Sequence, residues 1–130
     1  MRVRATVALA AGAALAALAA PAAVTQATAH TGLEASTPRH GATVARVPAT
    51  VTLTFAGPLT RVDAVRVTRD GRGDLVRRAR LDPRDARRVV VSLTRPGRRA
   101  QAARYRVVWR VRGADGHALR GVVAFRVRGR

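Results

Sequence analysis

The sequence predicts an all-β fold, an antiparallel Greek-key β-sandwich of immunoglobulin-like type with about seven or eight strands. Short segments in which apolar and polar residues alternate recur along the chain. Turn signals separate them roughly every 8–12 residues, which is typical of sandwiches. No helical period appears after the first 29 residues. The chain has no cysteine, so no disulfide can join the two sheets, and we expect Trp109 to fill the core instead.

The first 29 residues are interpreted as a secretory signal that is removed. Two early arginines precede an almost unbroken Ala/Leu/Val run over residues 5–20, and Ala27-Thr28-Ala29 offers the small residues that signal peptidase recognises. A membrane anchor is disfavoured because the run is short, rich in alanine and closed by a proline. We therefore expect residues 1–29 to be the signal and residues 30–130 to form one domain, exported to the periplasm or the extracytoplasmic cell envelope.

The first half of the expected domain has one clear strand and several weaker ones. In Thr50–Phe55, valine, leucine and phenylalanine alternate with three threonines, as in a strand with one buried face. Asp70-Gly71 predicts a tight hairpin turn, and Asp82–Asp85 predicts either a turn or a single helical turn. The other expected strands are shorter or less regular and cover residues 32–35, 44–47, 62–68 and 75–81.

The second half contains the longest alternating segment. From Tyr105 to Val111 the odd-numbered residues are apolar, and most of the even-numbered ones are arginine. This pattern predicts a strand with one face toward the core and a guanidinium face toward water. Val89–Leu93 and Val122–Val127 are predicted to be further strands.

The formal charge of +18 is unusually high, and removal of Arg2 and Arg4 with the signal leaves +16. All the basic residues are arginine. They are spread along the strands, and the four aromatic residues occupy apolar strand faces, so the sequence lacks a stacking platform for specific nucleic-acid binding. We interpret the charge as a solvated arginine-rich surface, with non-specific polyanion binding as the alternative.

Three histidines are candidate metal ligands. Asp115 and His117 stand two residues apart in a glycine-containing turn after the long strand, although most such pairs are only solvated loop residues. Cleavage after residue 29 would make His30 the first residue, which then offers an α-amine and an imidazole together. His40 lies in a turn and is expected to be solvated. Without cysteine, and with Met1 as the only methionine, any site must use nitrogen and oxygen donors.

Several motifs, taken in order, resemble the CopC family of exported copper-binding proteins. They are His30–Pro38 followed by Gly41-Ala42, the segment Pro48–Phe55, Tyr105-x-Val107-x-Trp109-Arg110-Val111, Asp115-Gly116-His117, Gly121 and Phe125-x-Val127. The resemblance covers nearly all of residues 30–130.

The resemblance implies a small sandwich similar to cupredoxins that holds one Cu(II) ion near one end. The implied ligands are His30, through its amine and imidazole, together with Asp115 and His117. Some relatives have a methionine-rich Cu(I) site in the loop corresponding to residues 68–78. That loop contains no methionine here, so no Cu(I) site is expected. The implied partners are the copper ion and a membrane copper-transport protein, and we expect a monomer.

The function expected from the sequence is to sequester or carry Cu(II), for copper tolerance or for delivery to a membrane copper transporter, and not to act as an enzyme. One alternative is a basic sandwich that binds polyanions or the envelope and has a vestigial metal site. A histidine-brace copper oxidase is the other, and it is disfavoured because Asp115 would occupy a coordination position that O₂ chemistry needs open. No Ser-His-Asp set or carboxylate pair suggests hydrolysis.

Overall fold

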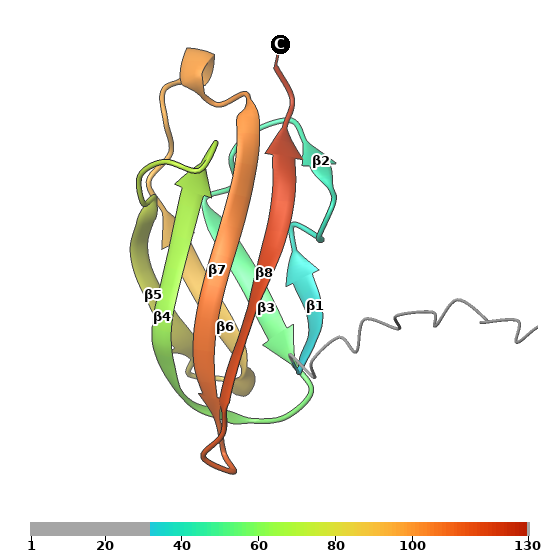
Figure 1. Ribbon diagram of the computed structural model, residues 1–130, viewed down its shortest axis with the longest axis vertical. Helices are drawn as coiled ribbons and strands as arrows, with labels where there is room; N and C mark the ends of the chain where they lie inside the picture. The colour runs from blue at the N-terminus through green and yellow to red at the C-terminus, as the bar shows by residue number, and fades with distance from the viewer. Residues whose placement is uncertain (1–31, 130) are drawn as a thin grey trace, which may run out of the picture.

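The computed structural model describes residues 32–129, so the expected signal and His30 lie outside the described residues. Two four-stranded sheets pack face to face (Figure 1). The first sheet has the order β1 (Leu33–Thr37), β3 (Thr50–Phe55), β6 (Asp85–Leu93) and β5 (Val76–Asp82). The second has the order β2 (Thr43–Val44), β8 (Ala118–Val127), β7 (Ala103–Gly113) and β4 (Leu59–Arg69). The predicted all-β sandwich is confirmed.

The only helical element among residues 32–129 is the short 3-10 helix η1 (Arg98–Ala100). In that part of the chain, no helix is long and apolar enough to cross a membrane. The Asp82–Asp85 segment was expected to be either a turn or a single helical turn. It is a hairpin turn between β5 and β6. Asp70 and Gly71 both have positive φ, 48° and 77°, and Arg69 and Arg72 exchange two backbone hydrogen bonds across them. The predicted tight turn is therefore confirmed.

One strand pairing differs from the antiparallel expectation, because β2 pairs with β8 in parallel. The chain crosses from the first sheet to the second after β1, and the Gly41 amide donates to the Ala124 carbonyl at 2.7 Å. The amides of Arg126 and Arg128 then donate to the carbonyls of Ala42 and Val44. The short β2 thereby occupies the backbone groups at the edge of β8, which would otherwise be open to another strand.

The core lies between the sheets and is built from the residues that the alternation assigned to it. Side chains of β3 and β6 face those of β7 and β8, and the buried residues include Val51, Leu53, Phe55, Val89, Val91, Leu93, Tyr105, Val107, Trp109, Val111, Val123, Phe125 and Val127. The rings of Phe55 and Trp109 meet edge to face at 4.9 Å, and those of Tyr105 and Phe125 stack at 5.3 Å. Trp109 fills the core as predicted.

Gly121 makes room for the indole of Trp109. The two residues are partners in the β7–β8 ladder. A β-carbon on Gly121 would lie 2.5 Å from Cζ2 of Trp109, closer than two such carbons can approach. Absence of a side chain at position 121 therefore lets the largest core residue lie across β8.

The end of the sandwich at the start of β7 is closed by Tyr105 and Gln101. The Tyr105 hydroxyl donates to the Gln101 carbonyl at 2.7 Å, an arrangement like the tyrosine corner of immunoglobulin-type domains. Burial raises the pKa of Tyr105, so the hydroxyl keeps the proton it donates. The Gln101 side chain accepts from the Val47 amide and donates to the Pro96 carbonyl.

We predict that Gly121→Ala destabilises the protein by about 1–3 kcal/mol, because the indole or the β8 backbone must shift. Gly97→Ala is the matched control, since a β-carbon there meets nothing within 4 Å. Urea unfolding followed by the fluorescence of the single tryptophan measures both variants. Equal stability of the two variants would contradict the role assigned to Gly121.

Candidate metal site

The hairpin between β7 and β8 carries Asp115 and His117 at one end of the sandwich (Figure 1). The Gly113 amide donates to the His117 carbonyl, and the Gly116 amide donates to the Gly113 carbonyl, each at 3.0 Å. Gly116 has φ of +85°, a conformation that glycine adopts without strain. The tight turn holds both candidate ligands at the end of a long, regular strand pair.

Asp115 and His117 contact each other directly. One carboxylate oxygen, Oδ1, accepts from the His117 amide at 3.0 Å, and Oδ2 lies 3.0 Å from Nδ1 of the imidazole. The hydrogen bonds from the His117 amide and then from its side chain lower the pKa of Asp115, so the carboxylate stays ionised. The side chains are 68% and 80% exposed, so an ion could reach both from solvent.

A hollow of about 330 Å³ lies beside this turn. Its lining comes from the first described residue, the β3–β4 connection and the hairpin: Gly32, Phe55, Gly57, Pro58, Leu59, Gly113, Ala114, Asp115 and Leu119. The Gly32 carbonyl accepts from the Ala56 amide at 2.7 Å, and a β-carbon on Gly32 would lie 3.1 Å from Leu119. The residue that precedes β1 thus lies beside the hairpin that carries Asp115.

Arg112 braces the hairpin, a contact that the sequence analysis missed. Its Nη1 donates to the Gly116 carbonyl at 2.8 Å, and its Nη2 lies 3.5 Å from Oδ2 of Asp63 on β4. Asp63 also accepts from Arg61, and that hydrogen bond is the main cause that lowers the pKa of the Asp63 carboxyl. Arg112 and Asp63 are 49 positions apart, so only the β4–β7 pairing brings them together.

The structure separates His40 from the other candidates. Its Nδ1 accepts from the Ala124 amide at 3.1 Å, next to the backbone bond between Gly41 and Ala124. Its role is to fix the turn before β2 against β8. Within residues 32–129, no group of three or more histidine, aspartate or glutamate side chains could hold a metal ion. Asp115 and His117 form a pair, and the third expected ligand, His30, lies outside the described residues.

Residues 33–128 match the family model of the CopC domain. The structure is similar to that of CopC from Methylosinus trichosporium OB3b, with TM-score 0.63 and 22% identity over 73% of this chain and 90% of that one. It is also similar to PcoC from Escherichia coli, described as a methionine-rich copper resistance protein, with TM-score 0.61 and 25% identity over 74% of this chain and 96% of that one. The present chain has one methionine. Comparison with curated proteins found no match.

We predict that Arg112→Gln loosens the hairpin, because glutamine cannot link Asp63 to the Gly116 carbonyl. Loss of a typical, partly exposed hydrogen bond costs about 1 kcal/mol, so the Gly116 amide should exchange with deuterium roughly fivefold faster. The ion pair between Arg112 and Asp63 should also weaken in acid. Because the pKa of the Asp63 carboxyl is lowered, the carboxylate keeps its charge until the pH falls below the ordinary value of 3.8, and only then are its ion pairs lost.

Arg110→Gln is the matched control. Arg110 precedes Arg112 on the same face of β7, and its charge also lowers the pKa of Asp63, but among the described residues its side chain makes no hydrogen bond or ion pair. The comparison therefore separates the bonds of Arg112 from its charge. Exchange rates that rise equally in both variants would show that Arg112 does not act through the hairpin.

Proposed function

The chain belongs to the CopC family, and we propose that it binds one Cu(II) ion through His30, Asp115 and His117. The observation that carries the proposal is the arrangement of the β7–β8 turn. The Asp115 carboxylate, which is ionised, and the His117 imidazole lie 3.0 Å apart there. Gly32, directly before β1, lines the same hollow as Asp115.

The path of the chain supports His30 as the third ligand residue. Two residues span at most about 7 Å of extended chain. Gly32 is close to Leu119, which follows His117 by two positions. A mature terminus at His30 is therefore within reach of the hairpin, provided that cleavage occurs after Ala29.

The donor set suits Cu(II). An amine, two imidazoles and a carboxylate supply nitrogen and oxygen donors for a tetragonal ion, and Cu(II) stands at the top of the divalent affinity order. No thioether or thiolate is present in residues 30–130, so the proposal does not extend to Cu(I). This differs from the methionine-rich PcoC, to which the fold is similar.

The exposure of the two ligands favours transport or storage of copper over catalysis. Within residues 32–129 both side chains stand at the tip of a hairpin and are largely exposed, whereas enzymes exclude water from an enclosed site. We propose an exported, monomeric, non-enzymatic protein that sequesters copper for tolerance or delivers it to a membrane copper transporter.

The first test is a Cu(II) titration with electron paramagnetic resonance on protein that begins at His30. We expect one Cu(II) per chain with nitrogen-rich tetragonal parameters. Asp115→Asn and His117→Ala should each weaken binding by at least about tenfold, since ligand loss costs a strong bond. One extra residue before His30 should do the same, because it converts the amine into an amide.

His40→Ala is the control, since His40 binds the Ala124 amide and takes no part in the site. Weak copper binding that is the same in the native-start, extended and His117→Ala proteins would refute the proposal.

Copper affinity should also fall as pH is lowered from 8 to 5. The amine and the imidazoles must release protons to bind the metal. Asp115 contributes little to this change, since its pKa is lowered and it stays ionised throughout. Titrations at several pH values measure the effect, and an affinity independent of pH would exclude nitrogen ligands.

A further inference from the structure

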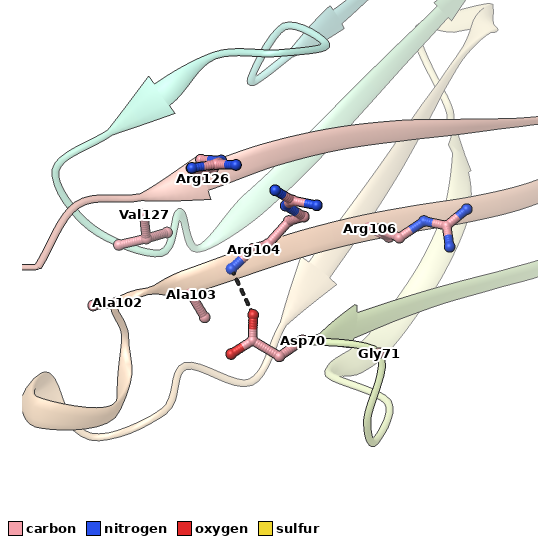
Figure 2. Close-up of a pocket in the computed structure, with 8 residues that line it drawn as sticks. All are labelled: Asp70, Gly71, Ala102, Ala103, Arg104, Arg106, Arg126 and Val127. Atoms are coloured by element: carbon pink, nitrogen blue, oxygen red, sulfur yellow. Dashed lines mark hydrogen bonds between the residues drawn. The ribbon is translucent and has the colours of Figure 1, made fainter.

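A second hollow, of about 680 Å³, lies at the end of the sandwich opposite the β7–β8 hairpin. Figure 2 shows Arg104 and Arg106 on β7 and Arg126 on the adjacent β8. Asp70, from the tight turn after β4, lies on the other side of β7 from Arg126. The remainder of β7, from Arg106 to Gly113, separates this hollow from the turn with the candidate copper ligands by roughly 23 Å.

The three arginines share one face of the sheet. Arg104 is the direct ladder partner of Arg126, and Arg106 follows Arg104 by two positions. Like charges that face each other across two strands destabilise a sheet. Among the described residues, none of these three guanidinium groups has a carboxylate within ion-pair distance. No direct ion pair therefore neutralises these guanidinium groups within the described part of the chain.

The one carboxylate that lines the hollow, that of Asp70, is hydrogen-bonded to the backbone and not to a guanidinium group. Asp70 Oδ1 accepts from the backbone amide of Arg104 at 3.0 Å (Figure 2). The Asp70 amide in turn donates to the Arg104 carbonyl at 2.8 Å. These two bonds fasten the tight turn to the start of β7. The wall of the hollow is thus fixed by backbone contacts, while the guanidinium groups remain available.

From these contacts we propose that the hollow binds a phosphate group through Arg104, Arg106 and Arg126. The planar guanidinium fork matches phosphate oxygens in pairs, which a lysine ammonium cannot do. A phosphate has several acceptor oxygens and up to two negative charges, and so can serve three guanidinium groups better than a single carboxylate.

Further arginines lie next to the hollow, along the outer face of the same sheet. Arg66, Arg110 and Arg120 stand on this outer face around Val108 and Val122, which are 43% and 40% exposed. A free diphosphate would engage the hollow alone, whereas a chain of linked phosphates would continue over these arginines. The diphosphate leaves the candidate copper-binding end uncovered, whereas the polymer would extend toward it, since Arg110 and Arg120 are ladder partners near the β7–β8 turn.

The test is calorimetric titration with inorganic pyrophosphate and with long-chain polyphosphate at about 0.15 M salt, where diffuse surface attraction is screened. Arg104→Gln/Arg126→Gln should weaken binding by at least about tenfold, because charge-assisted hydrogen bonds are lost. Arg78→Gln/Arg80→Gln on β5 is the matched control. It removes the same charge from exposed positions of the other sheet and should change affinity less than about twofold.

Tight binding of both probes identifies a short phosphate ligand, such as a free diphosphate, that the hollow alone accommodates. Binding of polyphosphate alone identifies a polymer as the source. Arg104→Lys/Arg126→Lys keeps the charge and should still lose affinity, because lysine lacks the fork. Equal losses in the β5 control pair, or no binding of either probe, would overturn the proposal. These outcomes are independent of copper binding, which is measured at the other end.

Discussion

The contact between Phe55 and Trp109 is the interaction on which the rest of the structure depends. It joins β3 of one sheet to β7 of the other, and Gly121 on β8 provides the space for the indole. Phe55 also lines the hollow beside Asp115, and Gly32, directly before β1, lies close to Phe55. The packing that closes the core therefore also sets the start of β1 beside the hairpin with the candidate ligands.

The fold could be predicted from the sequence because a sandwich of this kind depends on local alternation. Val51, Leu53 and Phe55 are buried as expected, and so are Tyr105, Trp109 and their odd-numbered neighbours on β7. The start of β8 was missed, since Ala118–Gly121 has little apolar alternation and becomes a strand through pairing with β7. The parallel β2–β8 pairing also had no local signal, because it arises from where the chain crosses between the sheets.

The candidate site was predicted only in part. The spacing of Asp115 and His117 in a glycine-containing turn suggested that they could act together, and the structure brings them into contact. The alternation predicted for Tyr105 to Val111, continued by one residue, puts Arg112 on the solvated face, and nothing in the sequence indicated a contact with Asp63. That contact depends on the register between β4 and β7, which neither strand reveals alone. Likewise, His40 gains its partner from β8, 84 positions away.

The placement of two ligand side chains at the tip of a hairpin has a consequence for kinetics. A metal ion held there, as proposed, would keep part of its coordination sphere open to solvent, because the Asp115 and His117 side chains are 68% and 80% exposed. The donors of an acceptor could then enter before His117 leaves. Such an exchange would be an associative substitution, in which the acceptor takes part in the rate-determining step and no free aqueous ion is formed.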